Sequence, residues 1–119
     1  GTVYIQEALD GTSWTFGEWL TANDSQAGDG YGWSSAVSGE RVLVGAPGAD
    51  LGTLADTGAV YVHERQANGV WLQVAKLQPA NLAGGARFGT AVALRGNVAV
   101  VGAPFDNNSG VNACGSVQI

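Results

Sequence analysis

The chain has 119 residues, enough for one domain with a modest core, and 19 of them are glycine, which favours many turns and closely packed backbones. The net charge of −5, with only five Lys and Arg, argues against a nucleic-acid surface and against binding to an anionic membrane. The apolar runs are too short to insert in a membrane, and the single Cys114 makes neither an internal disulfide nor a cysteine-based zinc site.

In chain order, short runs rich in Val, Ile, Tyr, Trp and Thr predict strands separated by Gly, Asn, Asp, Ser and Pro. The expected strands are residues 1–7, 13–20, 31–37, 41–47, 58–64, 70–77, 88–94 and 97–104, with a last one at 115–119. The tripeptides SGE (38–40) and RGN (95–97) predict tight hairpin turns with a central glycine. No helical periodicity longer than one turn is present, so the fold class is all-β.

The same pattern occurs twice, with a period of 57 residues. The tetrapeptide VGAP at Val44–Pro47 returns at Val101–Pro104, and Trp14 falls on Trp71. We therefore treat the chain as a single segment (1–119) made of repeat 1 (1–57), repeat 2 (58–114) and an extra closing strand (115–119).

Two of the predicted strands are apolar on both faces, VLV at 42–44 and VAVV at 98–101. A strand needs this pattern when its sheet is covered on both sides. Four-stranded antiparallel sheets stacked face to face around an axis meet the requirement, so we expect β-propeller blades. The small residues of the neighbouring strands suit the crowded innermost position; they are Ser34, Ala36, Ala91 and Ala93.

The repeat unit resembles the FG-GAP repeat, the blade of integrin α-subunit propellers and of many bacterial surface proteins. Tyr31-Gly32 and Phe88-Gly89 match the FG element, and residues 45–47 and 102–104 match GAP. Residues 58–62 match the following strand, and the W-x5-L tracts, 14–20 and 71–77, resemble an outer strand of the bacterial version. The resemblance implies a non-enzymatic propeller module at an extracellular or cell-surface location.

One part of the family pattern is missing. Many members carry a D-x-D-x-D-G calcium loop between the FG and GAP strands, whose closely spaced oxygens wrap a hard cation. Here that connection offers Glu40 alone in repeat 1 and no carboxylate in repeat 2. No metal site is therefore carried over, and we assign no catalytic, cofactor or metal residue.

The post-GAP loops still leave an alternative open, a calcium-binding module or a metal-dependent enzyme that uses loop carboxylates. The oxygen-bearing residues of these loops are Asp50, Asp56, Asp106, Asn107 and Asn108. They also suit an ordinary solvated loop with Asx turns. Asp24 and Asp29 lie in the loop 23–30, whose counterpart in repeat 2 has no carboxylate, so a polar connection is expected there.

The remaining candidates are read mainly as packing residues. His63 is the only histidine and stands on a strand, which favours a packed or surface role over a ligand or a base. Trp14 and Trp71 are in register and are expected to pack between blades. Trp19 and Trp33 are not repeated, which makes them better candidates for an exposed contact surface.

Two blades are too few for a ring, because propellers have about four to eight. We therefore expect the chain to be part of a larger propeller or to associate with copies of itself, for example as three or four chains. GTVYI (1–5) and GSVQI (115–119) are the same strand type, which suits a strand swap but leaves one strand surplus. The expected function is a scaffold or adhesion module that binds a protein or glycan through loops on one face.

Overall fold

A computed structural model describes residues 1–8, 11–14, 16–106 and 116–118 of the chain. Within these residues the structure is all-β, as predicted, and contains no helix, and therefore none that could span a membrane. The strands are β1 (Val3–Glu7), β2 (Phe16–Leu20), β3 (Ser34–Ser38), β4 (Arg41–Ala46), β5 (Ala59–Arg65), β6 (Trp71–Leu77), β7 (Ala91–Arg95), β8 (Val98–Ala103) and β9 (Ser116–Gln118).

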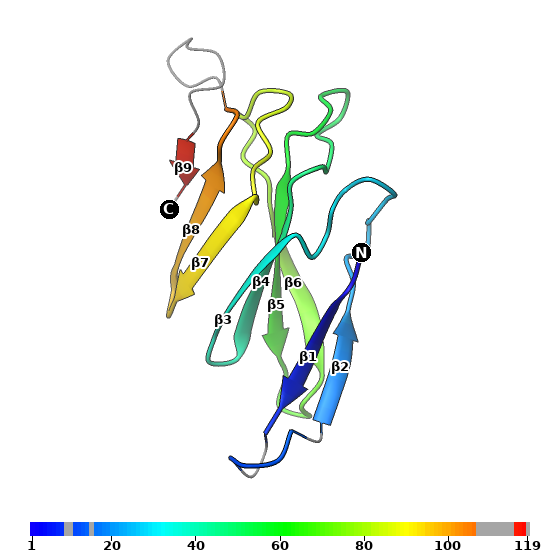
Figure 1. Cartoon of the computed structure of the whole chain (residues 1–119), viewed down its shortest axis with the longest axis vertical. Helices are drawn as coiled ribbons and strands as arrows, with labels where there is room; N and C mark the ends of the chain where they lie inside the picture. The colour runs from blue at the N-terminus through cyan, green and yellow to red at the C-terminus, as the bar shows by residue number, and fades with distance from the viewer. Residues whose placement is uncertain (9–10, 15, 107–115, 119) are drawn as a thin grey trace.

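The strands form three antiparallel sheets with the orders β1-β2, β3-β4-β5-β6 and β7-β8-β9 (Figure 1). The central sheet, called here the central blade, is a complete four-stranded propeller blade. It takes its first two strands from repeat 1 and its last two from repeat 2, so the blade and the 57-residue repeat are out of phase. The other two sheets hold the two outer strands of one blade and the first three strands of another.

Local sequence explains the turns at one end of the blades. The turns of the β3–β4 and β7–β8 hairpins contain Gly39 at φ 58° and Gly96 at φ 57°, a left-handed conformation that costs glycine little. This confirms the two predicted tight hairpins. The third strand of each repeat begins later than expected, because the residues around Tyr31-Gly32 and Phe88-Gly89 form turns before β3 and β7.

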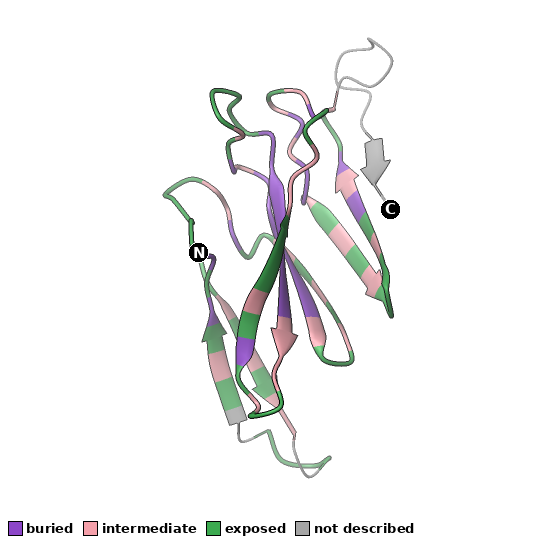
Figure 2. Ribbon diagram, turned by 180° about the vertical axis from the view of Figure 1, so that it is seen from behind, coloured by how far each residue is buried: buried purple, intermediate pink, exposed green. Residues whose placement is uncertain are grey.

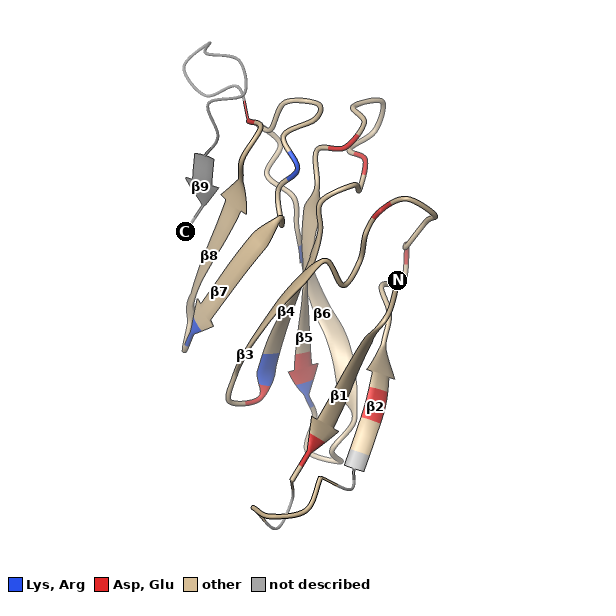
Figure 3. Cartoon of the chain, in the orientation of Figure 1, with Lys and Arg blue, Asp and Glu red and all other residues tan. Residues whose placement is uncertain are grey.

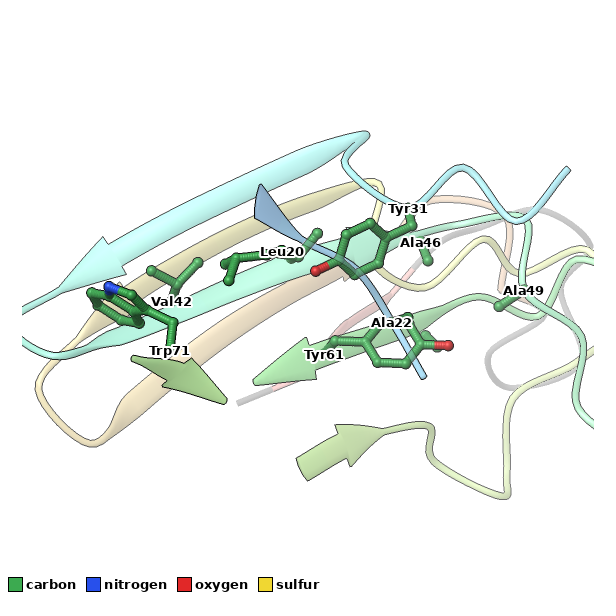
Figure 4. Packing of buried hydrophobic residues seen from close by; sticks show 10 residues of the cluster. Leu20, Ala22, Tyr31, Val42, Ala46, Ala49, Tyr61 and Trp71 are labelled. Atoms are coloured by element: carbon green, nitrogen blue, oxygen red, sulfur yellow. The ribbon is translucent and has the colours of Figure 1, made fainter. Parts of the chain in front are cut away.

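The core lies on both faces of the central blade. On one face, Val42, Val44 and Tyr61 belong to a cluster with Leu20 and Trp71 (Figure 4). Val3 and Ile5 of β1 pack against this cluster. On the other face, Leu43, Val60 and Val62 pack with Phe88 and with residues of β7 and β8. β4 is buried on alternate sides from Val42 to Ala46, which confirms that it is covered on both faces.

β8 differs from the expectation that it is covered in the same way. Val101 is buried against the central blade, but Val98 and Val100 are 53% and 36% exposed. Figure 2 shows green, exposed segments along β7 and β8. The physical reason is that, among the described residues, the sheet β7-β8-β9 has a neighbouring sheet on one face only. Only one of the two apolar faces of β8 is therefore buried in this structure.

Glycines of the FG and GAP elements, together with Gly58 just before β5, lie where the central blade contacts the sheet that follows it. A Cβ on Gly45 would collide with the carbonyl of Gly89, and one on Gly58 would collide with backbone atoms of Phe88. Ser34 Oγ donates a hydrogen bond of 2.7 Å to the same Gly89 carbonyl. These glycines let two backbones touch, so the repeated motifs set the distance between blades.

Candidate functional site

The long connections of the blades lie together at one end of the molecule, opposite the short hairpins (Figure 1). They are residues 21–33, 47–58 and 78–90, and they carry several of the acidic side chains, coloured red in Figure 3. We call this region the loop end. A hollow of about 270 Å³ opens here, and Asp24, Asp29, Asp50 and Lys76 are among the residues that line it. The structure thus brings together carboxylates from two loops that are distant in sequence.

Asp24 is held in a small polar network. Its carboxylate accepts hydrogen bonds from Lys76 Nζ at 2.6 Å and from the Tyr61 hydroxyl at 2.7 Å. The bond from Lys76, together with the bond from Tyr61, holds the pKa of Asp24 below its usual value. Burial, reinforced by the Asp24 carboxylate, raises the pKa of Tyr61. Asp24 therefore stays ionised and ties the loop end to β5 and β6.

The other loop carboxylates largely stabilise their own loops. Asp50 Oδ1 accepts a hydrogen bond from the Asp56 backbone N–H at 3.0 Å, and Asp29 Oδ2 accepts one from the Gln26 N–H at 2.9 Å. Among the described residues, no three His, Cys, Asp or Glu side chains gather as a metal site would require. Asp106 lies just after β8, whereas Asn107, Asn108 and Cys114 fall outside the described residues.

His63 is a packed core residue, in line with the preferred interpretation. It is 2% exposed, and a hydrogen bond of 2.7 Å joins its Nε2 to the hydroxyl of Tyr31. Burial lowers the pKa of His63 and raises the pKa of Tyr31. The imidazole is therefore neutral and satisfies a buried hydroxyl between the central blade and the loop before β3.

The tryptophans follow the expectations with one exception. Trp71 is buried at 5% exposure, and Trp19 and Trp33 are exposed at 66% and 64%, as predicted for each. The prediction that Trp14 packs between blades is wrong, because Trp14 is 65% exposed. The repeat aligns Trp14 with Trp71. In the central blade β4 lies on the inner edge of β5, whereas no described strand lies on the corresponding edge of β1. Trp19 stacks obliquely on Tyr4, with ring centroids 4.6 Å apart.

Sequence reasoning did not single out Lys76 or Tyr61, which organise the loop end. Lys76 aligns with Trp19 across the repeat, so the repeat contained no signal for an ion pair. Tyr61 was visible only as a repeated aromatic residue. The partner of both is Asp24, which lies 37 residues before Tyr61, so only the packing of the β2–β3 connection on the central blade reveals the contact.

Comparison with known families agrees with this geometry. The family model described as FG-GAP repeat matches residues 14–63 and again residues 71–119. Together these two matches cover most of the chain, which therefore belongs to the FG-GAP repeat family. A search of curated proteins returned no match. FG-GAP repeats occur in propeller-type modules and are typical of extracellular or surface proteins.

Proposed function

We propose that the chain is a non-enzymatic propeller module of an extracellular or cell-surface protein, a scaffold that binds a ligand through its loop end. The observation that carries this proposal is the use of the candidate chemical groups for packing. His63 is hydrogen-bonded to Tyr31, and the Asp24 carboxylate accepts hydrogen bonds from Lys76 and Tyr61. Such hydrogen-bonded pairs stabilise the stacked sheets, which then act as a rigid scaffold that positions the loops for binding.

The chemistry of the loop end favours a protein ligand with a basic patch over an acidic glycan. Asp24, Asp29 and Asp50 line the hollow, and Lys76 is one cation among them. Leu54 is 43% exposed on the loop that carries Asp50, and Phe105 after β8 is 51% exposed. Apolar side chains beside carboxylates suit the core and rim of a protein interface.

Binding assays on a defined panel test this function. The labelled chain is applied to a glycan array and to immobilised basic and acidic model proteins at two salt concentrations. We expect salt-sensitive binding to the basic proteins, weakened by Asp29→Asn and by Leu54→Ala. Val74→Ala is the matched control, because Val74 is 49% exposed on β6 and lies outside the hollow. Unchanged binding by the Asp29→Asn and Leu54→Ala variants, or a preference for acidic glycans, would contradict the proposal.

A calcium test addresses the alternative of a metal-dependent module. Thermal unfolding is measured with calcium and with a chelator. We expect equal melting temperatures, because the Asp50 carboxylate already accepts the Asp56 backbone N–H and no cluster of three carboxylates forms among the described residues. A ligand that binds only the folded state at 100 times its Kd stabilises by about 2.7 kcal/mol, so a true site gives a clear shift. A large calcium-dependent stabilisation would overturn the preference for a metal-free scaffold.

A further inference from the structure

A groove of about 730 Å³ runs along β1 and the face of the central blade beside it. Val37 and Val42 of the central blade line it, and Val37 is 66% exposed. β1 pairs with β2 on one side, and no described strand pairs with its other edge. Trp71 also lines the groove, and its buried Nε1 has no hydrogen-bond partner among the described residues. The groove is thus largely apolar space beside an open strand edge.

The repeat indicates which strands fit this space. β1 is the repeat-1 equivalent of β5, and β5 pairs through the corresponding edge with β4 of the β3–β4 hairpin. The repeat-2 equivalent of that hairpin is β7–β8. β8 pairs with β9, a third strand of the β1 type, and the register is the same: Gly45 faces Val60 in one pair and Gly102 faces Val117 in the other. A β7–β8 hairpin therefore has the register that β1 requires.

The exposed face of β7–β8 complements the groove. Val100 is the equivalent of Leu43, which is 1% exposed because the following sheet covers it, whereas Val100 is 36% exposed. On the groove side, Val37 is the equivalent of Leu94, which packs in the contact between the central blade and β7–β8. The uncovered faces of β8 and of the groove are therefore the two halves of a contact that this chain already makes once.

We propose that the β7–β8 hairpin of a second copy of this chain occupies the groove, with its β8 paired to β1 in place of its own β9. The register places Val101 of the second copy opposite Tyr4 and Ala99 of the second copy opposite Gln6. This inference rests on the proposed function only in treating the chain as a propeller module. Each chain then supplies eight strands to two four-stranded blades, and β9 is the strand left out.

The aromatic residues explain why β1 is the better partner for β8. In the central blade, Tyr61 of β5 lies edge-on to Tyr31, with ring centroids 5.5 Å apart. The equivalent pair across the new contact is Tyr4 with Phe88 of the second copy, both aromatic. β9 has Gln118 at that register position. β1 also brings its five-residue pairing with β2, whereas β9 contributes three residue pairs.

Charges at the hairpin end agree with this placement. In the existing contact, the Gly96 N–H donates to Ser38 Oγ at 3.1 Å. In the proposed contact, Gly39 takes the place of Gly96, and Arg95 of the second copy takes the place of Ser38. Arg95 of the second copy then lies next to Glu40, whose side chain is 73% exposed. The contact is head-to-tail, and such contacts form a ring when the rotation between copies closes. A closed ring of roughly two to four copies would hold the four to eight blades of known propellers.

Light scattering coupled to size exclusion tests the association. The full chain is expected to elute as a concentration-dependent multiple of its 12.1 kDa mass. Val100→Asp and Val37→Asp alter exposed positions on the two surfaces, so each variant should fold and run as a monomer. Val74→Asp, an exposed control on β6, should associate like the original chain. Because no other ligand is needed, this assay can fail while the loop-end binding assay succeeds, and the reverse.

Disulfide trapping tests the register. Gln6→Cys and Ala99→Cys are made separately, each with Cys114→Ser, then mixed and oxidised. We expect a covalent heterodimer, no such product when Val74→Cys replaces Ala99→Cys, and more of it when Val117→Pro weakens β9 in the chain that carries Ala99→Cys. A wild-type chain that stays a monomer at every concentration, association unaffected by Val100→Asp and Val37→Asp, or equal trapping of the two cysteine pairs would overturn the proposal.

Discussion

Leu43 and Val100 occupy the same position in the two repeats, and their burial differs because, in the part of the chain that the structure describes, a sheet covers only the first. Leu43 is 1% exposed and Val100 is 36% exposed. Leu43→Ala removes the equivalent of about three methylene groups at about 0.8 kcal/mol each, and a cavity adds to this. We therefore expect the free energy of unfolding to fall by about 3–4 kcal/mol. Val100→Ala removes two groups that are partly solvated already, for a loss of about 1 kcal/mol or less.

The assay is urea unfolding followed by circular dichroism, at concentrations where light scattering gives the monomer mass. A domain of this size has a stability of roughly 6–18 kcal/mol, so the change at Leu43 is measurable without abolishing the fold. The slope against urea should stay the same in both variants, which isolates stability from changes in the unfolded state. Equal losses at the two positions would refute the claim that blade stacking, rather than the apolar pattern of the strand, sets burial.

Three further predictions concern other parts of the molecule. The free energy of unfolding should fall as the pH drops below about 6.5, because the imidazole of the unfolded chain gains a proton there while burial keeps His63 neutral in the folded state. His63→Gln should reduce this dependence of stability on pH. Asp24, whose pKa is lowered, contributes to the pH dependence only below about pH 4. Gly89→Ala should cost about 2 kcal/mol or more, since Gly89 has φ 96° and its added Cβ would lie 2.6 Å from the Ala59 carbonyl; Gly85→Ala, at φ 77° with open space around it, should cost less in the same urea titration. Acrylamide should quench the fluorescence of a Trp71→Phe variant completely, because the three exposed indoles are left, while the original chain keeps a protected fraction; full quenching of both chains would place Trp71 at the surface.

Sequence reasoning reached most of the fold because strand patterns and turn glycines are local signals. The hairpins at Gly39 and Gly96 follow from the conformations that glycine alone adopts cheaply. The double burial of β4 follows from its unbroken apolar run. The same logic failed at Val98, Val100 and Trp14, because repetition predicts what a residue is suited to contact and not whether a neighbouring sheet is present.

The candidate site was less accessible to sequence reasoning. The hollow at the loop end joins Asp24 and Asp50 from loops that align poorly across the repeat, and its one cation comes from β6. Their proximity depends on how the β2–β3 and β4–β5 connections fold over the central blade. The role of VGAP was also only half visible. Its recurrence reveals the repeat, but the contact of Gly45 with the Gly89 backbone, which fixes the blade spacing, needs the three-dimensional structure.

Hydrogen exchange resolved by residue is the most direct test of the central claim that the chain is a stack of propeller sheets around one complete blade. β4 and β5 are interior strands of the only described four-stranded sheet, and their core residues are buried. We predict that the amides of Val42, Val44 and Val60 exchange slowest, at rates set by global unfolding, and that amides of β7 exchange faster. Equal protection along β4 and β7, or the strongest protection in the loop end, would contradict the stacked-blade account.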